Sequence, residues 1–269
     1  MEVSYHNHSK WSDGQNTVEE MFLAAKAAGL REFGLSDHFV VPGLPELNDK
    51  EWSMPIGQVD AYMEEVSACC RKVASEDFSP RIGLEVDYFR ENWKEVDAIL
   101  KRLPLDYCIG SNHYSFSFSI DHDASDWEPL SQEEIDRIYQ EHWQKMLEMA
   151  QTGAFDIAGH IDLPKKFGFA CSCDLSDLQE ATLLAIRDSD MAMELNTAGW
   201  FKQCQEAYPS LKLLKRAHEL GIPVIISADA HQTGHVMRAF DRAQALLAEA
   251  GYGYQRWHYV KRKRLPLKE

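Results

Sequence analysis

Residues 223–231 read PVIISADAH, a run of β-branched residues that ends in Asp229 and His231. Its length and composition are those of a buried strand. The same order, a short apolar run followed by histidine or an acidic residue, recurs along the whole chain. These runs predict the strands Glu2–His8, Glu32–Ser36, Arg81–Asp87, Asp106–Ser111, Asp156–Gly159, Met191–Leu195 and Pro223–Ser227.

Segments with helical periodicity follow the predicted strands. The first contains a capping box, because Glu20 follows Thr17 by three residues, and it ends near Gly29. The predicted helices are Thr17–Ala28, Val59–Ala74, Trp93–Lys101, Ser131–Gln151, Leu178–Arg187, Tyr208–Leu220 and His235–Ala250. Such alternation of strands and helices is typical of a parallel sheet. A last apolar run, Tyr254–Val260, is expected to add a strand or a sheet edge.

Seven or eight strand–helix units in 269 residues favour an α/β fold. We expect a closed or nearly closed β/α barrel, with a doubly wound open sheet as the alternative. The sequence contains no internal repeat, Pro/Ser-rich linker or low-complexity tract, so we expect one domain over residues 1–269. It also lacks the Gly-x-Gly-x-x-Gly and Walker patterns of nucleotide-binding folds.

The composition narrows the possible partners. Acidic residues outnumber basic ones by 43 to 28, which gives a formal charge of −15. This balance argues against long nucleic acids and anionic membranes and favours a small-molecule substrate. Because the apolar stretches are short and the N-terminus lacks a signal-peptide pattern, we expect a cytoplasmic protein without a membrane span.

Six cysteines are scattered along the chain without the paired spacing of a zinc ribbon. Cys171 and Cys173 could chelate a soft metal, but no second pair accompanies them. Reduced thiols are therefore the default expectation.

Every predicted strand delivers histidine or an acid near its C-terminal end, where barrel enzymes place their active sites. In His6-x-His8 and Asp229-x-His231 both side chains point to the same side, since strand periodicity is two. The other residues of this kind are Asp13, Asp37, His38, Glu85, Asp87, Asn112, His113, His160, Asp162, Glu194 and Asn196. Imidazole and carboxylate are ligands for Zn, Mn or Fe. So many donors predict two or three divalent metal ions, whose natural reaction is phosphate-ester hydrolysis through a metal-bridging hydroxide.

The order of these motifs also matches a known family. The motifs are His6-Asn-His8 with Ser-Asp13-Gly, Ser-Asp37-His38, Gly-Leu-Glu85-Val-Asp, Gly-Ser-Asn-His113, Gly-His160-Ile-Asp-Leu-Pro-Lys-Lys-Phe-Gly, Glu194-Leu-Asn-Thr-Ala-Gly and Ser-Ala-Asp229-Ala-His231. Together they resemble the PHP (polymerase and histidinol phosphatase) superfamily, from Tyr5 to about Leu265. Gly159–Gly168 and Asn196–Gly199 point to its histidinol-phosphate phosphatase branch.

The resemblance implies a distorted (β/α)7 barrel with three divalent metals at the C-terminal ends of the strands. It assigns the first metal to His6, His8, Glu85 and Asp229. Glu85 would bridge to a second metal, held by His113 and His160. The third metal would be held by Asp13, His38 and His231. Asp37 would orient a ligand. The implied activity is that of a phosphomonoesterase that hydrolyses L-histidinol phosphate in histidine biosynthesis.

A phosphate monoester needs positive charge beyond the metals. Lys165, Lys166 and Lys202 follow metal-bearing strands and are the candidates for binding it. Relatives often carry arginine after Asn196-Thr-Ala-Gly199, whereas this chain has Trp200-Phe201-Lys202. Lysine gives a point charge without the bidentate fork of arginine.

Asp229 and His231 are the candidates for protonating the leaving alcohol. The candidate partners of the imidazole ring are Tyr114, Phe116 and Trp200. Two alternatives stay open: an enzyme of the same superfamily that acts on another small phosphate ester or a phosphodiester, and a metal-binding module without catalysis.

Overall fold

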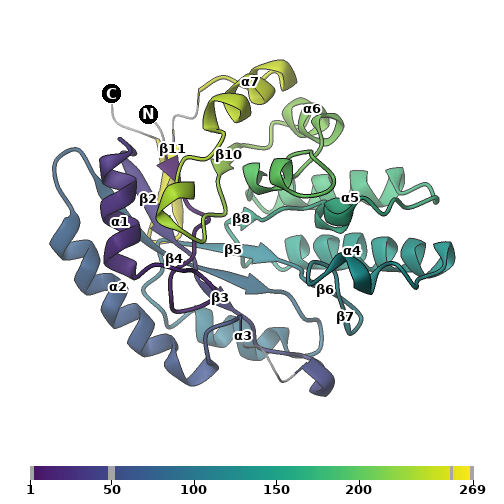
Figure 1. Cartoon of the computed structure of the whole chain (residues 1–269), viewed down its shortest axis with the longest axis horizontal. Helices are drawn as coiled ribbons and strands as arrows, with labels where there is room; N and C mark the ends of the chain where they lie inside the picture. The colour runs from purple at the N-terminus through teal and green to yellow at the C-terminus, as the bar shows by residue number, and fades with distance from the viewer. Residues whose placement is uncertain (1–2, 48–51, 255–256, 267–269) are drawn as a thin grey trace.

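The computed structural model describes residues 3–47, 52–254 and 257–266. Parallel strands follow one another in the order β1-β2-β4-β5-β8-β9-β10 (Figure 1). Their bounds are β1 Val3–Ser4, β2 Glu32–Leu35, β4 Ser79–Asp87, β5 Tyr107–Ser111, β8 Ile157–Ala158, β9 Ala192–Asn196 and β10 Val224–Ser227. A short strand β3, His38–Phe39, pairs with the second half of β4.

The first and last strands of this series meet at a short seam. Asn7 and Ala230 form an isolated parallel bridge, and the amide of His8 donates to the carbonyl of Ala230 at 2.9 Å. Because the strand order also has no switch point, the sheet is a nearly closed barrel and the open-sheet alternative is wrong.

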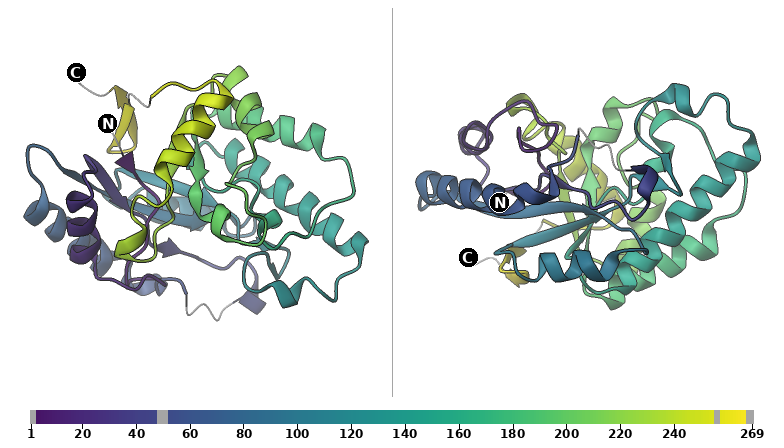
Figure 2. Two further views of the ribbon diagram at one scale, coloured as in Figure 1. Left: turned by 45° about the horizontal axis from the view of Figure 1, so that its top comes forward. Right: turned by 90° about the horizontal axis from the view of Figure 1, so that it is seen from below.

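Helices form the outer layer around the strands (Figure 2). Their bounds are α1 Val18–Ala27, α2 Val59–Val73, α3 Trp93–Leu100, α4 Gln132–Gln151, α5 Ser176–Asp188, α6 Leu211–Glu219 and α7 Phe240–Ala250. The predicted capping box of Thr17 and Glu20 is present at α1. Within the described ranges, no helix is both long enough and apolar enough to span a bilayer.

Two helices begin later than predicted. α6 begins at Leu211, because Tyr208 instead bridges to Asn196 at the end of β9. α7 begins at Phe240, because Ala239 takes a left-handed conformation with φ 60° that a continuous helix does not allow.

The C-terminal run forms a hairpin outside the barrel. β11, Trp257–Val260, pairs antiparallel with β12, Lys263–Pro266. Of the predicted strands, Glu2 and residues 255–256 lie outside the described part of the chain. A further hairpin, β6 Tyr114–Ser115 with β7 Phe118–Ser119, follows β5 and was not predicted.

Tyrosines close the N-terminal end of the barrel. The Tyr107 hydroxyl donates to the carbonyl of Tyr5 at 2.5 Å, and Tyr259 of the hairpin donates its amide to the Tyr5 hydroxyl at 3.1 Å. Gly34 and Gly83 make room for the Tyr107 side chain, since a Cβ at Gly34 would lie 2.2 Å from its hydroxyl oxygen and a Cβ at Gly83 would lie 2.3 Å from its ring. The filled floor leaves the opposite end, at the C-terminal ends of the strands, for the candidate site.

Candidate metal centre

Glu85, fully buried on β4, lies at the centre of the histidines that the sequence analysis singled out. Its Oε2 is 2.7 Å from His38 Nδ1 and 3.0 Å from His6 Nε2. Its Oε1 is 2.9 Å from His160 Nε2 and 3.6 Å from His113 Nε2. One carboxylate thus brings together imidazoles from four strand ends.

Two further carboxylates extend the cluster toward the solvent. Asp229 Oδ1 lies 3.1 Å from His8 Nε2, and Asp13 Oδ2 lies 3.2 Å from His231 Nε2. His38 Nε2 is 3.6 Å from Asp13 Oδ1, which joins this outer part to the Glu85 centre. The Asp13 and His231 side chains are about one third exposed, so the cluster is reachable from outside.

The donor atoms of all nine predicted ligands converge in four overlapping groups, each with its donor atoms within 4.8 Å of one another. The groups are His8, Asp13, His38 and His231; His6, His160 and Asp229; His6, His8 and Glu85; and His38, Glu85 and His113. The first group contains the predicted third set and adds His8. The other predicted sets are shared among neighbouring groups, so the division of ligands between individual ions stays a prediction.

Unsatisfied polar atoms test whether cations fit here. Within the described ranges, His6 Nε2, both ring nitrogens of His8, His38 Nδ1 and Glu85 Oε2 are buried without a hydrogen-bond partner. Buried polar atoms without partners are destabilising and rare. Divalent cations coordinated by these lone pairs would satisfy them, and the nitrogen–oxygen donor set suits Zn, Mn or Fe.

Two buried carboxylates orient the imidazoles. Glu194 Oε1 is 2.7 Å from His6 Nδ1, and its Oε2 accepts the backbone amide of His160 at 2.9 Å. Asp87 Oδ1 is 2.6 Å from His113 Nδ1. A carboxylate at Nδ1 fixes the tautomer, so Nε2 of His6 and His113 presents its lone pair to the centre.

Asp37 acts on the loop that carries Asp13. It accepts the Ser9 amide at 2.7 Å, the Ser9 hydroxyl at 2.9 Å and the Ser12 hydroxyl at 2.7 Å. Asp37 thus holds the chain between His8 and Asp13 in place, an indirect positioning role like the one expected for it.

The protonation states of Glu85 and His8 suit metal ligands, whereas at His6, His113 and His231 the neighbouring acids outweigh burial and raise the pKa, so a cation must displace a proton from each of these three. Burial alone would raise the pKa of Glu85, but the neighbouring His6 and His38 hold it well below its ordinary value. Burial, together with the nearby His38 and His231, lowers the pKa of His8 to about 3. The carboxylate is therefore ionised and the His8 imidazole neutral at pH 7, as coordination requires.

The cluster opens into a cavity of about 430 Å³. Lys166, Lys202 and Arg238 line it and supply positive charge. The Lys166 ammonium donates to the carbonyl of Asp121 at 2.6 Å, and Arg238 Nε is buried without a partner among the described residues. Lys165 is not part of this lining.

The Lys165 ammonium has other contacts. It lies 2.8 Å from Asp162 Oδ2 and 2.6 Å from Glu206 Oε2, and it donates to the Ala207 carbonyl at 2.8 Å. The substrate-binding role of Lys165 stays a prediction, but the structure ties its charge to these acids.

Sequence reasoning missed several residues of this cavity. Arg238, Asp121 and Trp52 line it and were not singled out, and none of Tyr114, Phe116 and Trp200 is among its described lining residues. Trp52 reaches the site because its ring contacts His38 and His113 edge-on, with centroids 4.7 and 5.4 Å away. Only Arg238 had a usable signal, since it follows the Asp229-x-His231 motif closely.

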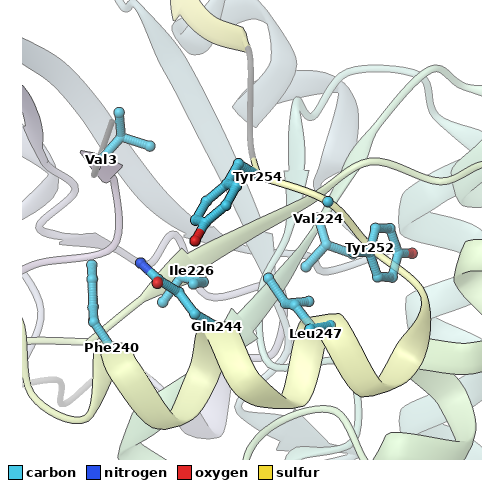
Figure 3. Close-up of a pocket in the computed structure, with 10 residues that line it drawn as sticks. Val3, Val224, Ile226, Phe240, Gln244, Leu247, Tyr252 and Tyr254 are labelled. Atoms are coloured by element: carbon cyan, nitrogen blue, oxygen red, sulfur yellow. The ribbon is translucent and has the colours of Figure 1, made fainter.

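A second cavity, of about 180 Å³, lies between α7 and β10 (Figure 3). Val3 and Val224, at the beginnings of β1 and β10, help to line it, so it opens away from the metal centre. Its described lining contains no histidine or acidic residue. It therefore offers no comparable chemistry.

Comparisons with known proteins agree with this geometry. The PHP domain family model matches residues 4–198. The "Probable histidinol-phosphatase" of Deinococcus radiodurans is 33% identical over 235 residues, 87% of this chain and 88% of that protein. The histidinol-phosphatase of Bacillus subtilis is 26% identical over 247 residues, 84% of this chain and 91% of that protein. The structure of histidinol phosphate phosphatase from Lactococcus lactis, complexed with Zn, L-histidinol and phosphate, shares the fold, with a TM-score of 0.78 at 18% identity and 98% of each chain covered.

Proposed function

Because the chain belongs to the PHP domain family, we propose that it is a metal-dependent phosphomonoesterase that hydrolyses L-histidinol phosphate to L-histidinol and phosphate, a step of histidine biosynthesis. The observation that carries this proposal is the convergence of nine residues with nitrogen and oxygen donors, Glu85 at their centre, beneath a cavity that Lys166, Lys202 and Arg238 line. The histidinol-phosphatase names of the Deinococcus and Bacillus relatives support the substrate. We further propose that one domain spans residues 1–269, and the cytoplasmic location stays a prediction.

Two or three divalent ions fit the donor set, with Zn, Mn and Fe as the candidates. When bound, such ions supply an acidified water as the nucleophile and neutralise the phosphate oxygens. The residues of this chain hold the ions in place through Glu85, orient the imidazoles through Glu194 and Asp87, and bind the substrate.

Lys166, Lys202 and Arg238 are the groups that bind the phosphate. All three line the cavity. Arg238 provides the planar guanidinium, able to donate two hydrogen bonds to one phosphate, that Lys202 lacks.

The leaving alcohol needs a proton. His231 Nδ1 lies 2.9 Å from the backbone carbonyl of Asp229 and is placed to donate to it, which leaves Nε2 facing Asp13 and the cavity. We propose that Asp229 or His231 passes to the leaving alcohol a proton taken from the attacking water, because both line the cavity.

The other end of the substrate carries an imidazole and an ammonium group. Asp121 is an acidic group and Trp52 an aromatic group of the lining that suit the ammonium and the imidazole. Neither is among the nine ligands, so both can act on specificity without changing the metal content.

The test is inorganic phosphate release from L-histidinol phosphate, compared with p-nitrophenyl phosphate and bis-p-nitrophenyl phosphate, after reconstitution with Mn²⁺ or Zn²⁺. A strong preference in kcat/KM for L-histidinol phosphate supports the proposal. Equal or better turnover of the diester, with L-histidinol phosphate ignored, would instead favour a phosphodiesterase, and absence of all three activities in the metal-loaded protein would favour a non-catalytic module.

A further inference from the structure

Two cysteines and an aspartate converge away from the barrel mouth. Cys171 and Cys173 lie in the loop before α5, and their Sγ atoms are 2.7 Å apart. Asp136 lies on α4, and one of its carboxylate oxygens is within 4.8 Å of both sulfurs. None of these residues belongs to the four groups around Glu85.

The loop is fixed to α4 by hydrogen bonds. Asp136 Oδ1 accepts the Ser172 amide at 2.7 Å, and its Oδ2 accepts the Ser172 hydroxyl at 2.6 Å. Gln132 Nε2 donates to the Ala170 carbonyl at 3.0 Å. Because these contacts already order the loop, a ligand bound between its sulfurs and α4 pays little conformational entropy.

We propose that Asp136, Cys171 and Cys173 form a binding site for a thiophilic divalent cation such as zinc, separate from the catalytic cluster. Two thiolates and a carboxylate are ordinary zinc ligands. The fold thereby supplies the third ligand that the Cys-x-Cys spacing lacks. Asp136 Oδ1 accepts from the Ser172 amide and, at 2.8 Å, from Gln132 Nε2, whereas Oδ2 accepts the Ser172 hydroxyl and keeps a second lone pair with which it can coordinate.

The cation takes the place of two thiol protons, which are released on binding. Zinc–sulfur bonds of about 2.3 Å in tetrahedral geometry separate two sulfurs by about 3.8 Å. The sulfurs of Cys171 and Cys173 must therefore move apart by about 1 Å, which side-chain rotation allows because both residues are partly exposed.

Gln140 contacts one of the two sulfurs. Its Nε2 is 3.5 Å from Cys173 Sγ, and it lies one helical turn after Asp136, on the same face of α4. The fourth position is left for water.

The experiment uses the full chain, reduced and with its catalytic centre loaded with zinc, and titrates it with Cd²⁺. Sulfur-to-cadmium charge transfer in the ultraviolet reports thiolate coordination alone, and the barrel-mouth ligands include no cysteine. We expect one equivalent of Cd²⁺ to produce the band and to raise Tm. Cys171→Ser and Cys173→Ser should lose the band at one equivalent, and Asp136→Asn should weaken Cd²⁺ binding by about tenfold or more.

The matched control is a Cys69→Ser, Cys70→Ser double variant. These cysteines are adjacent on α2, where successive side chains diverge, so the band should be unchanged. A band that survives in the Cys171→Ser, Cys173→Ser double variant would overturn the proposal. The proposal would also be overturned if the reduced wild-type protein, with both thiols shown to be free by thiol titration, binds no Cd²⁺. Phosphate release does not enter any of these readouts, so this proposal and the proposed function can fail separately.

Discussion

Replacing Glu85 with glutamine tests the centre of the proposed site. Its two oxygens lie within 3.6 Å of nitrogens of five histidines, and it belongs to two of the four ligand groups. A carboxylate that only orients a metal ligand is worth about 10- to 100-fold in metal affinity or activity, or about 1.4 to 2.7 kcal/mol. Because Glu85 belongs to two ligand groups, we count a loss of about 10- to 100-fold for each of them. We therefore expect Glu85→Gln to lower kcat/KM by about 10²- to 10⁴-fold, or about 3 to 5 kcal/mol.

Glu194→Gln is the matched control. Glu194 is as completely buried as Glu85 but contacts the cluster through His6 Nδ1 and the His160 amide only. Its loss should therefore cost about 10- to 100-fold. Both variants are assayed by phosphate release from L-histidinol phosphate, by metal content after dialysis and by circular dichroism.

The two variants separate a ligand from an orienting residue. If Glu85→Gln keeps its full metal content and loses no more activity than Glu194→Gln, Glu85 is not a shared ligand and the cluster has been assigned wrongly. A folded Glu85→Gln protein that has lost metal and activity together is the expected result.

Three other predictions concern charge and packing. Burial lowers the pKa of Lys145 from 10.5 to about 8, so between these pH values the folded chain binds fewer protons than the unfolded chain. The free energy of unfolding should gain about 3 kcal/mol from this group as pH rises through that range, and denaturant unfolding from pH 7 to 10 should show this rise in the wild type and not in Lys145→Met. Arg238→Ala should raise KM for L-histidinol phosphate about tenfold more than Lys165→Ala does, since only Arg238 lines the cavity; the reverse order in initial-rate measurements would contradict its placement. Gly34→Ala places a Cβ 2.2 Å from the Tyr107 hydroxyl and should lower the free energy of unfolding by about 1 to 3 kcal/mol, and an unchanged Tm would show that the floor yields easily.

The sequence was sufficient wherever function depends on strand alternation. His6 and His8 flank Asn7, whose parallel bridge continues β1, so they share a side as the period of two predicts. Asp229 and His231 also reach the cluster, but they lie beyond β10 and Asp229 has a left-handed φ of 51°, so a turn and not strand alternation places them. The barrel itself followed from the number and order of strand–helix units, and the structure confirms it.

Local backbone turns limit which site residues can be predicted from the sequence. Lys165 and Lys166 are neighbours on the 3₁₀ turn Leu163–Phe167, where successive side chains diverge by about 120°. Only Lys166 lines the cavity, and no pattern in the sequence fixes the phase of so short a turn. Arg238 was missed for a related reason, since the left-handed Ala239 ends the turn that carries it before α7 begins.

Strand β4 shows how closely the fold and the site depend on each other. Alternate residues of β4 face the barrel interior: Gly83 lies against Tyr107 at the floor, Glu85 binds the histidines, and Asp87 orients His113. The parallel register sets Glu85 opposite His38 of β3, while Leu84 and Val86 between them pack in the core with the helices. A slip of one residue would turn leucine and valine into the mouth and bury the carboxylates among apolar side chains. The register of β4 that places Gly83 against Tyr107 therefore also decides which side-chain atoms can coordinate a metal.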